Sequence, residues 1–72
     1  MTQRLLNGLR QERERLGLTQ GELARQVGVS RKTINTIENL VFAPSALLAI
    51  RLAQNVGRTV EELFWISEEH QS

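Results

Sequence analysis

Two adjacent cations near the middle of the chain are followed by two short polar side chains, and together these could hydrogen-bond to an anionic or polar partner. Arg31 and Lys32 carry the charges, and Asn35 and Thr36 follow them. On a helix, Lys32 and Thr36 lie on nearly the same face because they are four residues apart. Guanidinium and ammonium groups suit guanine O6 and N7, where a good bidentate contact discriminates between bases by about 1–3 kcal/mol, and Asn35 could reach a base or a phosphate. An isolated Arg-Lys pair is more often an ordinary solvated surface, so the interpretation depends on the elements that hold it.

Groups suited to catalysis or metal binding are sparse. The chain has no cysteine, which excludes a disulfide and a cysteine-based zinc site. His70 is the single histidine and has no partner histidine, so we expect no metal site and no cofactor. The acidic residues near the end of the sequence fit a solvated helix end and an acidic tail: Glu61, Glu62, Glu68 and Glu69. We therefore expect a protein that is not an enzyme.

Length and charge limit the class of protein further. The 72 residues suffice for one small domain, which buries only roughly 60% of its unfolded surface and is marginally stable unless it oligomerises. The net charge is +1, but the acids cluster near the end of the sequence and the remainder is basic. The sequence shows neither a long apolar run nor a signal-peptide pattern, so we expect a cytoplasmic protein with no membrane contact.

Helix start and stop signals surround the two cations. Thr19 and Glu22 form a capping-box pattern, in which the hydroxyl accepts from the Glu22 N–H while the carboxylate reaches back. Gly28 can adopt the positive φ of a tight turn, and Ser30 is a good N-cap for the next helix. Counted from Gln20, positions 4, 5, 8, 10, 15 and 18 are apolar: Leu23, Ala24, Val27, Val29, Ile34 and Ile37. The small alanine and the glycine make this pattern specific, and it predicts a helix-turn-helix over residues 20–39.

Three further helices are expected around this unit. The first begins with Asn7 as its N-cap, places Leu9 and Leu16 on one face, and stops at Gly17. The fourth begins at Pro44 and Ser45 and stops at Gly57, and a second capping box at residues 59–62 opens the fifth.

The two ends of the chain are expected to be extended. Residues 4–6 precede the first N-cap, and residues 64–66 form an aromatic and β-branched run of the kind that favours strands. We expect the ends to pair as a short antiparallel ribbon. The predicted fold is an all-α, compact five-helix domain over residues 1–72, with an N-terminal arm at 1–6 and a C-terminal tail at 65–72.

The stretch GLTQGELARQVGVSRKTINTIEN resembles the lambda-repressor/Cro-like family, also called the XRE family, and the similarity continues through PSALLAIRLAQNVGRTVEELF. The resemblance implies a five-helix DNA-binding domain that acts as a dimer on a palindromic operator. In the helix-turn-helix geometry that the resemblance implies, the first turn of the third helix enters the major groove of DNA. The resemblance implies that Arg31, Lys32 and Thr36 read bases and that Gln20 fixes the DNA backbone. The full set of expected DNA contacts is Gln20, Ser30, Arg31, Lys32, Thr33, Asn35, Thr36 and Asn39.

Two features flank the expected reading helix. By resemblance, Arg13 and Glu38 match an ion pair that ties the first helix to the end of the third. The pair could orient the reading helix, but a purely structural salt bridge is the preferred interpretation.

The family commonly has glycine and basic residues after the third helix, whereas this chain has residues 40–44, LVFAP. Leu40 lacks the easy positive φ of glycine. The phosphate contacts of this loop are therefore in doubt, except those of Asn39 and the backbone.

The fourth helix has a second apolar face beside the one for the core, which suggests that a second copy of the chain covers it. Scattered apolar residues on a surface are also normal. The expected homodimer contact comprises Leu47, Ile50, Phe42, Trp65 and Ile66.

The expected function is that of a transcriptional regulator, a repressor that binds double-stranded DNA. The alternative is a protein-interaction module of the same fold, such as an antitoxin whose main partner is a toxin.

Overall fold

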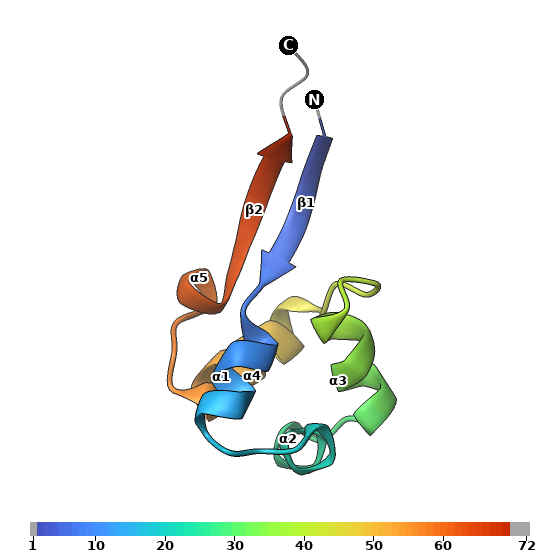
Figure 1. Ribbon diagram of the computed structural model, residues 1–72, viewed down its shortest axis with the longest axis vertical. Helices are drawn as coiled ribbons and strands as arrows, with labels where there is room; N and C mark the ends of the chain where they lie inside the picture. The colour runs from blue at the N-terminus through green and yellow to red at the C-terminus, as the bar shows by residue number, and fades with distance from the viewer. Residues whose placement is uncertain (1, 70–72) are drawn as a thin grey trace.

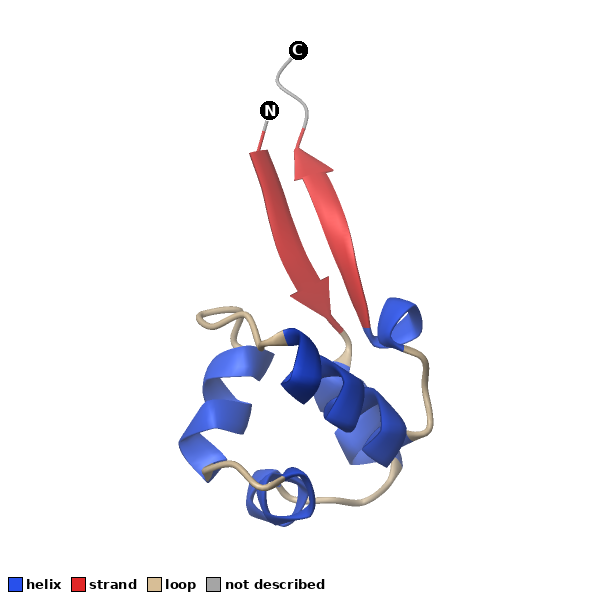
Figure 2. Ribbon diagram, turned by 180° about the vertical axis from the view of Figure 1, so that it is seen from behind, coloured by secondary structure: helices blue, strands red, loops and turns tan. Residues whose placement is uncertain are grey.

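Five short helices meet around one apolar core, and a two-stranded antiparallel ribbon projects from them. The computed structural model describes residues 2–69, and Figure 1 shows the ribbon extending away from the helical unit, with α2 at the opposite end. Figure 2 shows the same arrangement from behind. The elements, in chain order, are β1 Thr2–Asn7, α1 Leu9–Arg15, α2 Gln20–Val27, α3 Arg31–Glu38, α4 Ala46–Val56, α5 Val60–Leu63 and β2 Phe64–Glu69.

The core is built from the apolar stripes of the helices. The buried members are Leu9, Leu23, Ala24, Val27, Ile34, Ile37, Leu52, Ala53, Val56, Leu63 and Phe64. The inner faces predicted for α2 and α3 are confirmed. Leu9 is buried, whereas Leu16, expected on the same face, follows the end of α1 at Arg15 and is 42% exposed. Leu18 packs against the core after the turn instead.

Side-chain caps begin the helices where the sequence predicts them. In α2 the Glu22 N–H donates to Thr19 Oγ1 at 3.0 Å and the Thr19 N–H donates to Glu22 Oε1 at 2.8 Å. The predicted second capping box, at Thr59 and Glu62, is also present. Asn7 is not the N-cap of α1 as predicted; it ends β1, and Gly8 is the N-cap. The reason is the strand pairing at Asn7, although its side-chain oxygen still accepts from the Leu9 N–H at 3.0 Å.

The predicted ribbon is present and is longer than the expected segments. Residues 2–7 pair with residues 64–69, so that Leu5 faces Ile66 and Leu6 faces Trp65. At its base the Gly8 N–H donates to the Leu63 carbonyl at 3.0 Å, which joins the ribbon to the helical unit. Residue 1 of the predicted arm and residues 70–72 of the predicted tail, including His70, lie outside the described residues. Among the residues described, no helix is long and apolar enough to cross a membrane.

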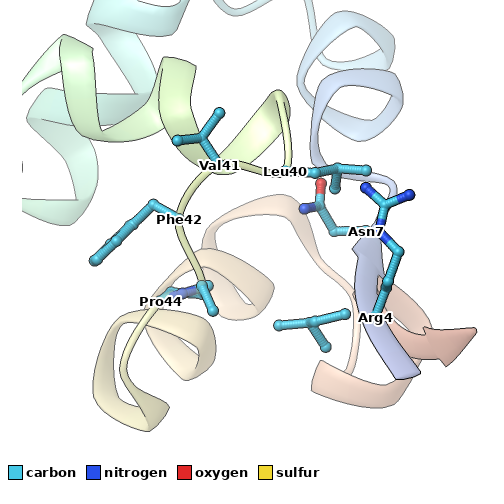
Figure 3. Close-up of a pocket in the computed structure, with 8 residues that line it drawn as sticks. Arg4, Asn7, Leu40, Val41, Phe42 and Pro44 are labelled. Carbon is cyan, nitrogen blue, oxygen red and sulfur yellow. The ribbon is translucent and has the colours of Figure 1, made fainter. Parts of the chain in front are cut away.

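Helix α3 ends in a Schellman motif whose left-handed position is occupied by a leucine. Leu40 has φ +62°, its N–H donates to the Ile37 carbonyl at 3.1 Å, and the Val41 N–H donates to the Thr36 carbonyl at 2.9 Å. Figure 3 shows Leu40 on the side of the loop that faces Asn7 and Arg4, where these residues line a cleft. The left-handed turn, for which glycine was expected, is thus made by leucine.

Replacing Leu40 by glycine is expected to give a protein about 0.5–1 kcal/mol more stable than replacing it by alanine. Both changes remove the leucine side chain, but alanine keeps the left-handed penalty of about 1–2 kcal/mol, while glycine's extra backbone entropy offsets only part of that gain. Urea denaturation of Leu40→Gly and Leu40→Ala measures the difference. A Leu40→Gly variant no more stable than Leu40→Ala would show that the positive φ costs no more than glycine's extra backbone entropy.

Candidate nucleic-acid interface

The first turn of α3 presents two unpaired cations to solvent. Ser30 is the N-cap, and its hydroxyl accepts from the Thr33 N–H at 3.1 Å. Arg31 and Lys32 follow directly and are exposed. Within residues 2–69, neither side chain forms a hydrogen bond or an ion pair. Two long cations without internal partners are available for an anionic or acceptor-rich ligand.

An open hollow joins the start of α2 to the outer face of α3. Its volume is about 400 Å³, and it is lined by Gln20, Arg31, Lys32 and Asn35. The structure therefore brings four of the predicted DNA-contacting residues together from two helices. Acceptor groups such as phosphate oxygens or guanine O6 and N7 match the donors that this hollow offers.

A second hollow lies further along the same helix. It is lined by Ser30, Lys32, Thr33, Thr36, Val41 and Phe42. The hydroxyls of Ser30 and Thr33 are 2.9 Å apart, and the Thr36 hydroxyl donates to the Thr33 carbonyl at 2.9 Å. Each of these hydroxyls already has a partner in this segment, and the methyl groups of the two threonines add apolar surface beside the lone pairs that their oxygens keep free. The sequence did not predict a role for Val41 here.

A buried carboxylate holds α3 against α1 and α2. Arg13 donates to Glu38 through Nε, at 2.7 Å from Oε2, and through Nη2, at 3.1 Å from Oε1. Gln20 Nε2 donates to Glu38 Oε1 at 3.0 Å. The Glu38 side chain is fully buried, and that of Arg13 is 12% exposed. The structure thus joins the two residues of the expected ion pair and adds Gln20, which uses one of its two amide N–H groups on Glu38 while it lines the first hollow.

The protonation of Glu38 follows from two opposing effects. Burial disfavours the charged carboxylate and would raise its pKa, but hydrogen bonds from Arg13 and Gln20 and the charge of Arg13 favour it. The balance leaves the pKa of Glu38 below its ordinary value. The carboxylate is therefore ionised at neutral pH and keeps its hold on α1 and α2.

Arg10 is a member of this site that sequence reasoning missed. Its Nη2 donates to Asn39 Oδ1 at 3.0 Å and its Nε donates to Glu38 Oε1 at 3.4 Å. Asn39 in turn donates to Asn35 Oδ1 at 3.2 Å. The spacing could have indicated this role, because Arg10 lies three residues before Arg13 and therefore on the same helix face. About half of the Arg10 side chain is exposed, so a cation stands beside Asn39 at the end of the reading helix.

The residues predicted for a dimer contact are exposed but lie on more than one surface. Leu47 and Ile50, near the start of α4, are 63% and 46% exposed. Trp65 and Ile66 are neighbours on β2, and successive side chains of a strand point to opposite faces. Ile66 pairs with Leu5, which lines the cleft against the loop at residues 40–44. Trp65 instead lies beside Gly8 at the start of α1. The strand therefore separates these two members of the predicted contact.

Comparison with known proteins matches most of the chain to one family. The model of the Helix-turn-helix family matches residues 9–63. An uncharacterized HTH-type transcriptional regulator of Methanothermobacter thermautotrophicus is 45% identical over 62 residues, covering 85% of this chain and 90% of the relative. The uncharacterized HTH-type transcriptional regulator YgzD of Bacillus subtilis is 36% identical over 64 residues, covering 89% of this chain and 97% of the relative.

A solved structure shows the same arrangement of helices. The crystal structure of the clp gene regulator ClgR from Corynebacterium glutamicum superposes with a TM-score of 0.71 and 28% sequence identity. The match covers 75% of this chain and 57% of the ClgR chain, so the chain spans little more than half of that protein. The arrangement of helices that holds Arg31 and Lys32 is therefore similar to one in a gene regulator.

Proposed function

Because the chain belongs to the XRE-type helix-turn-helix family of DNA-binding transcription regulators, we propose that it represses transcription by binding a palindromic operator as a homodimer. In this proposal residues 1–72 form one lambda-repressor-like domain, and the first turn of α3 enters the major groove. The unpaired cations Arg31 and Lys32, exposed beside Gln20 and Asn35, support the proposal most strongly.

The contacts divide by chemistry into base readers and backbone anchors. Arg31 and Lys32 read guanine through O6 and N7. Gln20, Asn39 and the newly found Arg10 lie at the edges of the reading face and hold phosphates, which fixes the position of α3 in the groove. Of the remaining predicted contacts, Asn35 lies between these groups on the outer face, and Ser30, Thr33 and Thr36 line the second hollow.

Titration of the protein with duplex DNA at two salt concentrations tests the function. The duplex is recovered by selection from a random library, and fluorescence anisotropy gives the dissociation constant. Specific binding that weakens steeply with salt is expected, since several phosphate contacts release counterions. A protein that ignores all duplexes at low salt would disprove the proposal, and the function would then move to the exposed apolar residues and a protein partner such as a toxin.

The dimer contact in this proposal uses the apolar side chains beside the loop at residues 40–44. Phe42, Leu47, Ile50 and Ile66 are all 46–63% exposed, and a helix with two apolar faces needs cover on both. Trp65, on the other ribbon face, contributes only if the partner also reaches α1. Two-fold symmetry would place two reading helices about 34 Å apart, which is one turn of B-DNA.

Leu47→Glu and Ile50→Glu are each expected to convert the dimer to a monomer. A carboxylate at the centre of an apolar contact loses its hydration without gaining a partner, and both positions are too exposed for the change to unfold the chain. Sedimentation at micromolar concentration should give twice the chain mass for the wild-type protein and one chain mass for the variants. Leu16→Glu, at an exposed position near the end of α1, is the control and should remain dimeric. A wild-type monomer at high concentration would end this part of the proposal.

A further inference from the structure

The loop after the reading helix carries two apolar side chains that have no role in the core. Val41 is 76% exposed and Phe42 is 48% exposed. Figure 3 shows both on the side of the loop away from Arg4 and Asn7, whereas Leu40 points toward them. Both residues line the second hollow together with α3. The loop therefore extends the reading face with an apolar wall.

The α3 side of this hollow is also more apolar than its residue types suggest. The hydroxyls of Thr33 and Thr36 are engaged with Ser30 and with the Thr33 carbonyl. New contacts that leave these hydrogen bonds intact can use the threonine methyl groups, although the hydroxyl oxygens can still accept hydrogen bonds. The hollow, of about 320 Å³, thus has Lys32 at one edge and four apolar groups around it.

We propose that this hollow binds the C5-methyl group of a thymine in the operator, with Val41 and Thr36 as the residues that recognise it. The inference rests on the proposed function, because the hollow shares Lys32 with the face that would enter the major groove. In that groove thymine alone among the four bases presents a methyl group. Lys32 reads an acceptor on one base pair, and the apolar wall selects an A·T pair beside it. This loop thereby confers base specificity instead of the phosphate contacts that its sequence has lost.

Replacing single thymines of the selected operator by deoxyuridine tests the proposal, since this removes the methyl group and leaves the base pairing intact. At one position in each half-site, deoxyuridine is expected to weaken binding about fourfold, and about fifteenfold when both half-sites carry it. Val41→Ala and Thr36→Ser should each reduce this discrimination, because each removes methyl groups from the hollow. Thr36→Ser keeps the hydroxyl and its hydrogen bond to Thr33, so helix α3 is preserved.

Control variants and DNAs separate the possible outcomes. Leu16→Ala, at the far end of α1, should discriminate between thymine and deoxyuridine as the wild-type protein does. If wild-type protein binds the operator but every deoxyuridine leaves affinity unchanged, the methyl site is disproved while the DNA-binding function stands. Discrimination that survives both Val41→Ala and Thr36→Ser would also overturn the assignment, because the methyl group would be read elsewhere. Absence of binding to any duplex would disprove the function as well.

Discussion

The double variant Arg31→Ala, Lys32→Ala is expected to bind the operator at least about 100-fold more weakly than the wild-type protein. A bidentate contact to guanine contributes about 1–3 kcal/mol of discrimination, and a dimer loses it in both half-sites. Because neither cation has a partner within residues 2–69, the substitutions leave no buried charge behind and should not affect folding. Anisotropy titration against the operator and against an unrelated duplex measures both affinities.

The two titrations distinguish base reading from simple charge attraction. Loss of base contacts lowers affinity for the operator much more than affinity for the unrelated duplex, whereas loss of charge lowers both alike. Arg4→Ala, Arg51→Ala is the matched control, since it removes two positive charges from the ribbon and from α4, and within residues 2–69 neither side chain forms an ion pair. If the control loses as much operator affinity as the Arg31→Ala, Lys32→Ala variant, α3 is not the reading helix.

Arg13→Ala is expected to destabilise the fold by about 3–5 kcal/mol, most of what a domain of this size has. The change leaves the fully buried Glu38 carboxylate without its main partner, and it also removes the hydrogen bond from Arg13 Nη1 to the Leu18 carbonyl at 2.8 Å. Urea denaturation followed by circular dichroism measures the loss. Arg15→Ala is the comparison in the same helix, because Arg15 is 47% exposed in its ion pair with Glu12 and also donates to the Val56 carbonyl at 3.0 Å, so that change should cost about 1–2 kcal/mol.

The same ion pair gives the stability of the protein a predictable dependence on pH. The pKa of Glu38 is lower in the folded chain than its ordinary value of 4.5, so its stabilising effect is complete above that value and is lost as the pH falls through the lowered pKa. The stability of Glu38→Gln should therefore fall less steeply in acid than that of the wild-type protein.

For the Arg13→Ala prediction, a variant no less stable than Arg15→Ala would show that the buried pair contributes little.

Local signals in the sequence predicted the part of the fold that local chemistry determines. The Thr19 and Thr59 capping boxes and the αL glycine at Gly28 depend only on residues near them, and each is found where expected. Asn7 is not the N-cap because it is the last residue of β1 and pairs with Phe64, far away in the sequence. Leu16, expected on the same face as Leu9, is exposed because α1 ends one residue before it. Tertiary context decided the first of these two differences.

The residue types on the outer face of α3 were predictable, but the neighbours that other elements supply to this face were not. The exposed positions of Arg31 and Lys32 could be predicted from the start signals of the helix alone, because neither side chain has a partner in another element. Arg10 and Val41 could not, since their roles depend on where α1 and the loop at residues 40–44 stand relative to α3. Leu40 shows the same limit, because the hydrogen bonds of the Schellman motif retain a left-handed turn that leucine alone would disfavour.

The ribbon joins the two sequence-distant ends of the described chain, and this sets an order for folding. Helices α2 and α3 are neighbours in sequence and assemble through contacts of low contact order, which form quickly. Strands β1 and β2 can pair only after the helical unit has brought Gly8 to Leu63, because closing so long a loop beforehand costs chain entropy. The ribbon therefore forms last and opens first. Opening of the outer pairs, residues 2–6 with 65–69, leaves the core and α3 intact, whereas opening at Asn7 and Phe64 would expose a core side chain and break the hydrogen bond from Asn7 Nδ2 to the Ile37 carbonyl at 3.1 Å.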